Sequence, residues 1–408
     1  MKCRHCQAEL VLPLIDLGAA PPSNAYLTGQ ALHAPEKYFP LRVLVCTECW
    51  LAQTEDYAGA GELFSADYAY FSSYSTTWLR HAEQYVADMV QRFGLNANSR
   101  IVEVAANDGY LLQFAKARDI PCLGIEPTAS TANAARAKGV EIIEAFFGVK
   151  LAKELVAQGR QADLTTANNV LAHVPDINDF VQGFAALLKP AGVATFEFPH
   201  LLRLVSENQF DTIYHEHYSY LSLTAVKRIF EHNGLNLFDV EELPTHGGSL
   251  RVYAQRSDSG RREQGRNVAA LLGREAAAGM ATPAFYLGFQ ARAEQLKNNF
   301  LFFLIEAKRA GKTVAGYGAA AKGNTLLNYA GIKPDLLPYV CDAAPSKQGK
   351  FLPGSHIPIV AEAHLMEYKP DYVVILPWNL REEVMAQLAY IRGWGGQFVI
   401  AVPEIKVA

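Results

Sequence analysis

Hydrophobic residues in the middle of the chain follow first the period of a helix and then that of buried strands. Between positions 76 and 95 apolar residues recur every three or four positions and stop at a break over 94–99, which predicts one amphipathic helix. The run RIVEVA over 100–105 predicts a buried strand, ANDG over 106–109 a sharp turn, and 110–118 a helix. This order of strand, turn and helix indicates the first unit of an α/β domain.

The alternation of strands and helices continues to about residue 200. Apolar strands are predicted at 121–125, 140–143, 162–167 and 192–198, and helices at 129–138 and 180–188. Strands that alternate with helices predict a parallel, doubly wound sheet, which binds its ligand at the carboxyl ends of the strands.

A second α/β pattern occupies the C-terminal part of the chain. Residues 289–311 predict one long amphipathic helix, and a strand over 312–316, a small-residue turn over 317–323 and a helix from Asn324 follow it. Later strands at 338–341, 373–376 and 397–402, with a helix at 381–392, complete a second parallel sheet of Rossmann-like type. The turn is only a loosened G-x-G-x-x-x-x-G, which disfavours a bound nicotinamide cofactor.

Length and composition exclude several classes of protein. The 408 residues suit two or three domains, and with half of them hydrophobic and 19% charged we expect a compact core. The net charge is −4 and the basic residues are spread along the chain, which argues against a nucleic-acid partner. Residues 1–10 lack the apolar run of a secretory signal, and no segment approaches the roughly 20 apolar residues that cross a bilayer. We therefore expect a cytoplasmic monomer without a membrane partner.

Four of the six cysteines form two C-x2-C pairs, Cys3 with Cys6 and Cys46 with Cys49. Thiolates at this spacing can converge on one tetrahedral Zn²⁺, which we expect to be structural because four thiolates leave no coordination position open. Alternating apolar residues over 41–45 predict a strand that leads into the second pair. A redox pair or disulfides are the alternative, which a reducing cell interior disfavours. For the two other cysteines we expect ordinary burial.

The turn after the first strand of the middle domain carries polar residues that suit a cofactor. Its sequence, E-x-A-x-N-D-G, runs from Glu103 to Gly109, and Glu126 ends the next strand 17 residues beyond Gly109. An acid at that place can accept hydrogen bonds from two ribose hydroxyls. Taken alone, the turn is also compatible with an ordinary α/β connection.

In their surrounding sequence these residues resemble the S-adenosylmethionine site of class I methyltransferases, and LKPAG over 188–192 resembles the loop before their fifth strand. Ala105 departs from the glycine that this family usually has. The resemblance implies a cofactor site in which Glu103, Ala105, Asn107 and Gly109 form the loop under the methionine part, Glu126 holds the ribose, Phe146 and Phe147 flank the adenine, Asn169 faces the methionine part and His173 lies near the sugar. For the last four a purely structural role stays open.

The segment DTIYHEHYSY over 211–220 concentrates ionisable side chains that neither helical nor strand periodicity requires. A histidine can take a proton from carbon next to a carbonyl, Glu216 or a neighbouring acid can fix its tautomer, and a tyrosine can stabilise an oxyanion. These groups suit enolate chemistry. The upstream segment YAYFSSYS over 68–75 is similar and could close over a substrate. The alternatives are a solvated polar loop for the first segment and interdomain packing for the second.

The whole chain resembles the sugar C-methyltransferases that modify nucleotide-linked keto-deoxysugars, which include the 3-C-methyltransferases of tetronitrose biosynthesis. The resemblance is nearly full length and includes the paired cysteines, YAYFSS, E-x-A-x-N-D-G, YHEHYSY, HGGSLR over 246–251, GYGAAAKG over 316–323, and 342–358. It implies His217 as the base, with Tyr214 and Glu216 beside it and Tyr70 reaching from the earlier segment. His217 would remove the proton next to the 4-keto group, and the enolate would attack the methyl group of S-adenosylmethionine.

The same resemblance implies that the C-terminal domain binds the sugar nucleotide. Its expected contacts are Lys322 and Lys347 with the diphosphate, Asn324, Gln348 and Asn379 with polar edges, and Trp378 with a flat surface, while His246 and Arg251 border the sugar. The double glycine after His246 permits close approach of a ligand or another segment. Surface or structural roles, and a β-bulge turn at the double glycine, are the alternatives.

The sequence thus predicts an α/β protein with three parts. They are a zinc-binding module over 1–66, a methyltransferase domain with a class I doubly wound sheet over 67–282, and a Rossmann-like nucleotide-sugar-binding domain over 283–408. The expected cofactors are S-adenosylmethionine and a structural Zn²⁺. Two other functions stay open: a small-molecule O- or N-methyltransferase, and a non-catalytic zinc-containing protein that binds a nucleotide.

Overall fold

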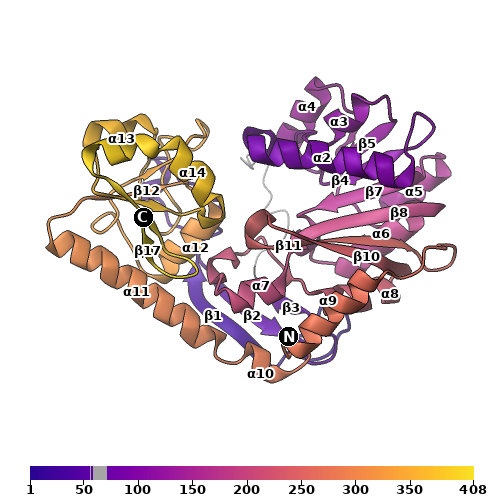
Figure 1. Cartoon of the computed structure of the whole chain (residues 1–408), viewed down its shortest axis with the longest axis horizontal. Helices are drawn as coiled ribbons and strands as arrows, with labels where there is room; N and C mark the ends of the chain where they lie inside the picture. Colours follow the sequence, from indigo (N-terminus) through magenta and orange to yellow (C-terminus); the bar gives the residue numbers. More distant parts are fainter. Residues whose placement is uncertain (56, 58–70) are drawn as a thin grey trace.

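The computed structural model describes residues 1–55, 57 and 71–408 of the chain, which form three sheets (Figure 1). The boundary expected at 66/67 and the segment that carries Tyr70 lie largely outside the described residues. Among the described residues no helix combines the length and apolar character that a membrane crossing requires.

The N-terminal sheet is antiparallel and includes one strand from a distant part of the chain. Its order is β1-β2-β3-β9, with β1 (Leu12–Ala20), β2 (Phe39–Val45), β3 (Ala52–Thr54) and β9 (Ser219–Tyr220). β2 confirms the strand expected before the second cysteine pair. β3 pairs with β9 at Ala52 and Tyr220, so the cysteine-containing module is hydrogen-bonded to the segment that carries the candidate base. The 3₁₀ helix η1 (Ala31–His33) lies between β1 and β2.

The middle sheet has seven strands in the order β10-β11-β8-β7-β4-β5-β6. They are β4 (Ile101–Val104), β5 (Cys122–Ile125), β6 (Ile142–Ile143), β7 (Ala162–Asn168), β8 (Leu188–Pro199), β10 (Leu235–Leu243) and β11 (Ser249–Arg256). β6, β5, β4, β7 and β8 are parallel, whereas β11 runs antiparallel to both β8 and β10. This confirms the expected doubly wound sheet, whose strand order reverses beside β4, the place where such sheets bind ligands.

Helices accompany this sheet; those near 76–95, 110–118, 129–138 and 180–188 are expected from the apolar periodicity, and the others have no expected counterpart. They are α2 (Thr76–Phe93), α3 (Leu112–Lys116), α4 (Ala129–Ala137), α5 (Val149–Ala157), α6 (Ile177–Leu187), α7 (Leu201–Ser206), α8 (Leu223–His232) and α9 (Arg266–Ala277), with the 3₁₀ helices η2 (Ser72–Tyr74), η3 (Leu171–His173), η4 (Phe210–Thr212) and η5 (Thr245–Gly247). α2 begins where the Ser75 hydroxyl accepts a hydrogen bond from the amide of Trp78 and ends at Gly94, whose φ is +65°.

Some boundaries differ from the expected ones. β8 begins at Leu188 because Leu188 pairs with Ala162 of β7, so the expected loop over 188–192 belongs to the strand. α5 has no counterpart among the expected elements, and β6 shrinks to two residues at the edge of the sheet.

The C-terminal sheet has the order β14-β13-β12-β15-β16-β17, and its first five strands are parallel, as the Rossmann-like prediction requires. Its strands are β12 (Val314–Tyr317), β13 (Val340–Cys341), β14 (Ile359–Val360), β15 (Tyr372–Ile375), β16 (Gln397–Ile400) and β17 (Lys406–Val407). The helices are α10 (Pro283–Tyr286), α11 (Phe289–Arg309), α12 (Ala321–Tyr329), α13 (Ala363–Tyr368) and α14 (Arg381–Gln387), with the 3₁₀ helices η6 (Trp378–Leu380) and η7 (Ala389–Trp394).

The long helix α11 joins the N-terminal and C-terminal sheets (Figure 1). Its buried residues Phe300 and Leu304 belong to one hydrophobic core that also contains Leu14 of β1 and Val374 of β15. Because a shared core fixes the relative position of the sheets it fills, the cysteine-containing module and the C-terminal domain form one packed unit.

Candidate active site

A cavity of about 570 Å³ lies at the carboxyl ends of β4, β5 and β7 and extends to the first turn of α12. Its volume falls in the range of roughly 300–1,000 Å³ that is usual for small-molecule sites. It is lined by residues of all three parts of the chain. The predicted site residues that line it are Ala105, Asn107, Glu126, Phe146, Phe147, Asn169, His173, Tyr214, His217, His246, Lys322 and Lys347.

At one end of the cavity, the turn after β4 holds an acidic side chain in a fixed position. Glu126 follows β5, and its two carboxylate oxygens accept hydrogen bonds from the backbone amides of Asn107 (3.0 Å) and Thr128 (2.9 Å). Each carboxylate oxygen can accept a further bond, so the group can also bind the two hydroxyls of a ribose. The geometry of Glu126 therefore fits the expected ribose contact of S-adenosylmethionine.

The backbone of this turn enters the left-handed region. Ala105 has φ +59° and Asn107 φ +48°, so the alanine that replaces the usual glycine adopts a glycine-like conformation. Gly109 has φ +73°, and a Cβ there would lie 3.1 Å from that of Ala135 on α4. Glu103 is fully buried in β4, and burial raises its pKa well above the usual value. Gly109 and Glu103 therefore shape the turn from behind and do not line the cavity.

The other residues expected around the cofactor differ in their surroundings. The ring of Phe147 packs 4.9 Å from that of Phe184, whereas Phe146 is 63% exposed at the cavity. Asn169, directly after β7, has φ +55°, and its buried side-chain oxygen has no hydrogen-bond partner among the described residues. Buried polar atoms are normally satisfied, so Asn169 has the capacity to bind a ligand.

The candidate base His217 is buried and held in one tautomer. Its Nδ1 lies 3.1 Å from the carbonyl oxygen of Thr212. A carbonyl can only accept, so Nδ1 carries the hydrogen and Nε2 keeps its lone pair. Burial, with the neighbouring His173, lowers the pKa of His217 well below its ordinary value, so the imidazole is neutral at pH 7. Neutral imidazole with a lone pair on Nε2 is the form that accepts a proton.

Two aromatic rings enclose His217. The ring centroid of Tyr214 lies 4.0 Å and that of His173 4.6 Å from that of His217. His173 in turn donates from Nδ1 to the carbonyl oxygen of Glu216 (2.8 Å), and burial lowers its pKa to about 4. This packing restricts the orientation of the His217 ring.

The expectation that Glu216 or a neighbouring acid fixes the His217 tautomer is wrong, because the backbone carbonyl of Thr212 does so. Glu216 does not line the cavity, and its carboxylate accepts a hydrogen bond from the side-chain amide of Asn24 (3.1 Å). Asn24 and Tyr26 do line the cavity, although they belong to the long insert between the cysteine pairs. No local motif marked these two residues in the sequence.

The C-terminal domain contributes two lysines to the cavity. Lys347 donates to the carbonyl oxygen of Ala319 (2.8 Å) and pairs with Asp342 (3.3 Å). Lys322, in the first turn of α12, is partly exposed, but its ammonium nitrogen is buried and lies 4.4 Å from the ring centroid of Trp378. α12 begins at Ala321, earlier than expected, which is why Lys322 belongs to the helix.

Other predicted substrate residues bind protein instead of lining the cavity. Trp378 donates from Nε1 to the carboxylate of Asp211 (2.7 Å), faces the Lys322 ammonium with its ring and does not line the cavity where we expected it to pack on a ligand. Arg251 of β11 forms a buried ion pair with Glu197 (2.6 Å), which satisfies its charge away from the cavity. Asn324 donates to the carbonyl of Ser23 and Gln348 to that of Asp342, and Asn379 lies outside the cavity lining. Tyr70 lies outside the described residues.

The double glycine brings the C-terminal domain close to the methyltransferase sheet. His246 (φ +57°) lines the cavity, and its ring lies 5.2 Å from that of Trp78, a cavity residue that the sequence interpretation missed. Gly247 has φ +88°, and a Cβ at this position would overlap the indole of Trp378. The close approach of another segment, expected from the double glycine, is therefore confirmed at Gly247.

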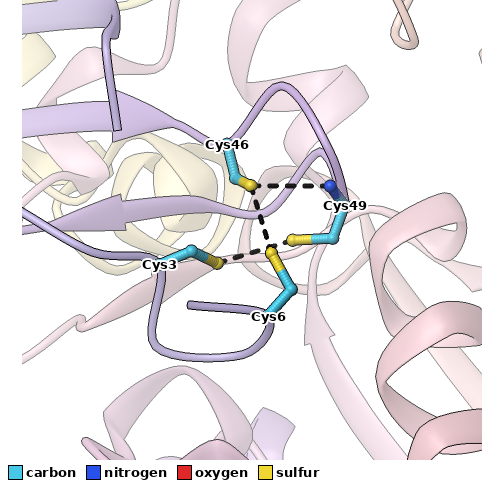
Figure 2. Close-up of side chains that lie close together, drawn as sticks. All are labelled: Cys3, Cys6, Cys46 and Cys49. Atoms are coloured by element: carbon cyan, nitrogen blue, oxygen red, sulfur yellow. Dashed lines mark hydrogen bonds between the residues drawn. The ribbon is translucent and has the colours of Figure 1, made fainter. Parts of the chain in front are cut away.

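The four paired cysteines meet in one cluster apart from the cavity (Figure 2). Their sulfur atoms all lie within 4.8 Å of one another, and those of Cys3 and Cys49 are 3.5 Å apart. Tetrahedral zinc with Zn–S bonds of about 2.3 Å requires sulfur separations of about 3.8 Å, so the cluster fits the ion. Three of the four cysteines are buried, and all four would coordinate the metal, which leaves no position for a substrate.

Comparison with known protein families matches the three parts of the chain in order. Residues 3–64 match a "Putative zinc binding domain", residues 78–240 a "Methyltransferase domain" and residues 244–403 a "C-methyltransferase C-terminal domain". The methyltransferase match covers β4 to β10, and the sheet is that of class I S-adenosylmethionine-dependent methyltransferases.

Individual proteins resemble the chain to different extents. Among solved structures, magnesium protoporphyrin IX methyltransferase from Synechocystis PCC 6803 is 16% identical over 44% of this chain and 79% of its own (TM-score 0.34). An S-adenosylmethionine-dependent methyltransferase from Clostridium acetobutylicum is 12% identical over 44% of this chain and 92% of its own (TM-score 0.36). The C-methyltransferase NovU of Streptomyces niveus is 34% identical over 406 residues, which cover 100% of this chain and 96% of NovU. The chain therefore belongs to the S-adenosylmethionine-dependent C-methyltransferase family that includes NovU.

Proposed function

We propose that this enzyme methylates a nucleotide-linked 4-keto-deoxysugar at the carbon next to the ketone, C-3, with His217 as the base. The observation that carries the proposal is the hydrogen bond from Nδ1 of His217 to Thr212, which leaves the lone pair on Nε2 of a side chain that lines the same cavity as Glu126. A C-methyltransferase must make a carbon nucleophilic, and a ketone makes the neighbouring C–H acidic enough for a neutral imidazole to assist. The sugar and its position follow from the family resemblance.

In the proposed reaction, Nε2 of His217 takes the proton from C-3. The electrons of the C–H bond form a C=C bond, and those of the C=O π bond move to the ketone oxygen as an enolate. S-adenosylmethionine supplies, when bound, the electrophilic methyl group that the carbon takes up, and the electrons of the broken S–CH₃ bond stay on sulfur, which gives S-adenosylhomocysteine. The rings of Tyr214 and His173 hold the imidazole in place and limit access of water, and Lys347 lines the region expected to hold the diphosphate.

Deuterium exchange from solvent tests this function directly. The wild-type enzyme, in D₂O with S-adenosylhomocysteine in the donor site, should exchange the C-3 hydrogen of a nucleoside diphosphate 4-keto-6-deoxysugar. His217→Asn should slow exchange and methylation by about 10²- to 10⁴-fold, the usual contribution of a positioned base. His33→Asn, at an exposed histidine, is the control and should match wild type. Retention of the C-3 hydrogen in the methylated product of the wild-type enzyme would eliminate the proposal.

The nucleotide itself requires a binding experiment. Thymidine, guanosine and cytidine diphosphates can be compared by thermal shift in the presence of S-adenosylhomocysteine. A ligand that binds only the folded protein raises the melting temperature by mass action, so the correct base should give the largest increase. The alternative of a small-molecule O- or N-methyltransferase predicts no such preference.

A further inference from the structure

Lys322 carries a buried positive charge that no described protein atom satisfies by hydrogen bonding. Its ammonium is fully buried and has no hydrogen-bond partner among the described residues, yet the side chain lines the cavity. An ammonium has three donors, and burying it without acceptors costs several kcal/mol. A ligand that supplies an acceptor oxygen would therefore stabilise this ammonium.

Trp378 and Asp211 hold the ammonium of Lys322 in place, but neither accepts a hydrogen bond from it. The indole of Trp378 lies under the ammonium at 4.4 Å and donates to one oxygen of Asp211, whose other oxygen has no hydrogen-bond partner among the described residues. Burial lowers the pKa of Lys322 to about 8 and the charge of Asp211 opposes that shift, so the ammonium persists at pH 7. Because Gly247 has no Cβ, the indole of Trp378 can pack directly against its backbone.

The same short segment positions both Lys322 and the base. The side chain of Asp211 accepts a hydrogen bond from Trp378, and the carbonyl of the next residue, Thr212, fixes the tautomer of His217. The carbonyl of the third residue, Ile213, accepts a hydrogen bond from Thr325 of α12 (2.8 Å). The Lys322 charge also contributes to the lowered pKa values of His217 and His246. The ammonium and the imidazole therefore line the same cavity and are close enough for their charges to interact.

We propose that Lys322 is a catalytic residue whose ammonium binds the ketone oxygen of the substrate and stabilises the enolate formed by His217, with Asp211 and Trp378 as positioning residues. This inference rests on the proposed function and replaces the diphosphate contact expected for Lys322. The ketone oxygen is separated from the acidic C–H by a single carbon, so a cation beside the base is well placed to reach it. A diphosphate in the same place would bring its charges close to the buried carboxylate of Asp211, whereas a ketone is neutral until the proton leaves.

The charges balance in this assignment. The C-3 proton passes to Nε2 of His217, and the negative charge appears on the ketone oxygen, where the Lys322 ammonium donates a hydrogen bond without losing its proton. Stabilisation of an oxyanion by a preorganised donor typically contributes about 10²- to 10³-fold to the rate, because the interaction strengthens as charge develops.

The test separates proton removal from nucleotide binding. Lys322→Met keeps the length of the side chain and removes its charge. With S-adenosylhomocysteine bound, the C-3 exchange rate at saturating substrate should fall about 10²- to 10³-fold. The Kd of the nucleoside diphosphate alone, which has no ketone, should stay within about twofold of wild type. Lys308→Met, at a lysine 57% exposed on α11, is the matched control and should leave both quantities unchanged.

The possible outcomes distinguish the inference from the proposed function. If wild type exchanges the C-3 hydrogen and Lys322→Met exchanges it equally fast, or if Lys322→Met mainly weakens nucleoside diphosphate binding, the enolate role is wrong. If wild type itself does not exchange, the proposed function fails first. Because Lys322→Met leaves Asp211 buried without its counter-charge, the double variant with Asp211→Asn is measured as well. An exchange rate in the folded double variant close to that of wild type would also overturn the inference.

Discussion

Two buried side chains at the cavity set the expected pH dependence of proton removal. His217 must be neutral, and its pKa lies well below the ordinary value because of burial and the nearby charges of His173, His246 and Lys322. The exchange rate should therefore rise with pH on the acid side and be close to its maximum at pH 7. Burial also raises the pKa of Asp211 to about 6, so the acid limb contains the titration of this carboxyl.

On the alkaline side Lys322 must stay protonated, and its pKa is about 8. The exchange rate should fall as pH rises through this value, which gives a bell-shaped profile when C-3 exchange is measured from pH 5 to pH 10. Lys322→Met should lose the alkaline limb and keep an acid limb that moves to higher pH, because the Lys322 charge that lowers the pKa values of His217 and Asp211 is gone. A variant that retains the same fall above pH 8 would show that another group causes it.

Site residues that belong to a recognisable motif could be predicted from the sequence, whereas contacts between segments far apart in the chain could not. Glu126 and His217 both line the cavity, as the motifs around them indicate. Thr212 acts through its backbone carbonyl, and a carbonyl carries no signal of residue type. Asn24 reaches Glu216 from an insert 192 positions earlier in the chain, a contact that only the packed domains create.

At the scale of elements, η5 and the start of η6 pack closely against each other where Gly247 meets Trp378. Gly247→Ala places a methyl group against the rigid indole of Trp378 and also forces alanine to φ +88°. The matched control is Gly18→Ala, where φ is +74° and nothing lies within 4 Å of the added methyl group. Both variants incur backbone strain of about 1 kcal/mol, and Gly247→Ala alone incurs a further 1–3 kcal/mol, roughly, from overpacking.

Denaturant unfolding measures this difference in the free energy of unfolding. Gly247→Ala should also slow C-3 exchange, because a displaced indole no longer holds Asp211 and Lys322, whereas Gly18→Ala should exchange at the wild-type rate. Equal destabilisation of the two variants would mean that the indole can move away without cost.

Elements with complete local signals matched the prediction best. α2 has an N-cap serine, a C-cap glycine and a continuous apolar face, and its bounds agree with the expected ones within two residues. The sequence predicts the start of α12 three residues too late, because the alanines before Lys322 suit a turn and a helix equally. β6 is only two residues long because it pairs with β5 only at Gly124 and Ile125, which the apolar run over 140–143 does not reveal.

At the scale of the whole molecule, three family matches follow one another along the chain, but how the matched parts pack together could not be predicted. Leu14 of β1 and Phe300 of α11 are ordinary apolar residues in the sequence, yet they share one core with the C-terminal sheet. Strand β9 leaves the methyltransferase region to complete the N-terminal sheet. Pairings between segments this far apart depend on the packed fold and have no local sequence pattern.

This packing connects the cysteine cluster to the candidate base His217, although the metal that the cysteines are expected to bind takes no part in the reaction. The hydroxyl of Thr54, at the end of β3, donates to the backbone carbonyl of His217 (3.1 Å), and the side-chain amide of Gln53 donates to the sulfur of Cys3 (3.3 Å). Cys49→Ser should therefore abolish the zinc content of one ion per chain, lower the melting temperature and slow C-3 exchange through disorder around β9.

The control for this prediction is Cys122→Ala, which changes a cysteine outside the cluster and should keep one zinc per chain and the wild-type exchange rate. Elemental analysis gives the zinc content, and thermal unfolding and C-3 exchange give the other two quantities on the same samples. Zinc is expected to act only by fixing β3 against β9, so metal loss should reduce exchange and stability together. A zinc-free Cys49→Ser protein with full exchange activity would show that the β3–β9 pairing holds His217 without the metal.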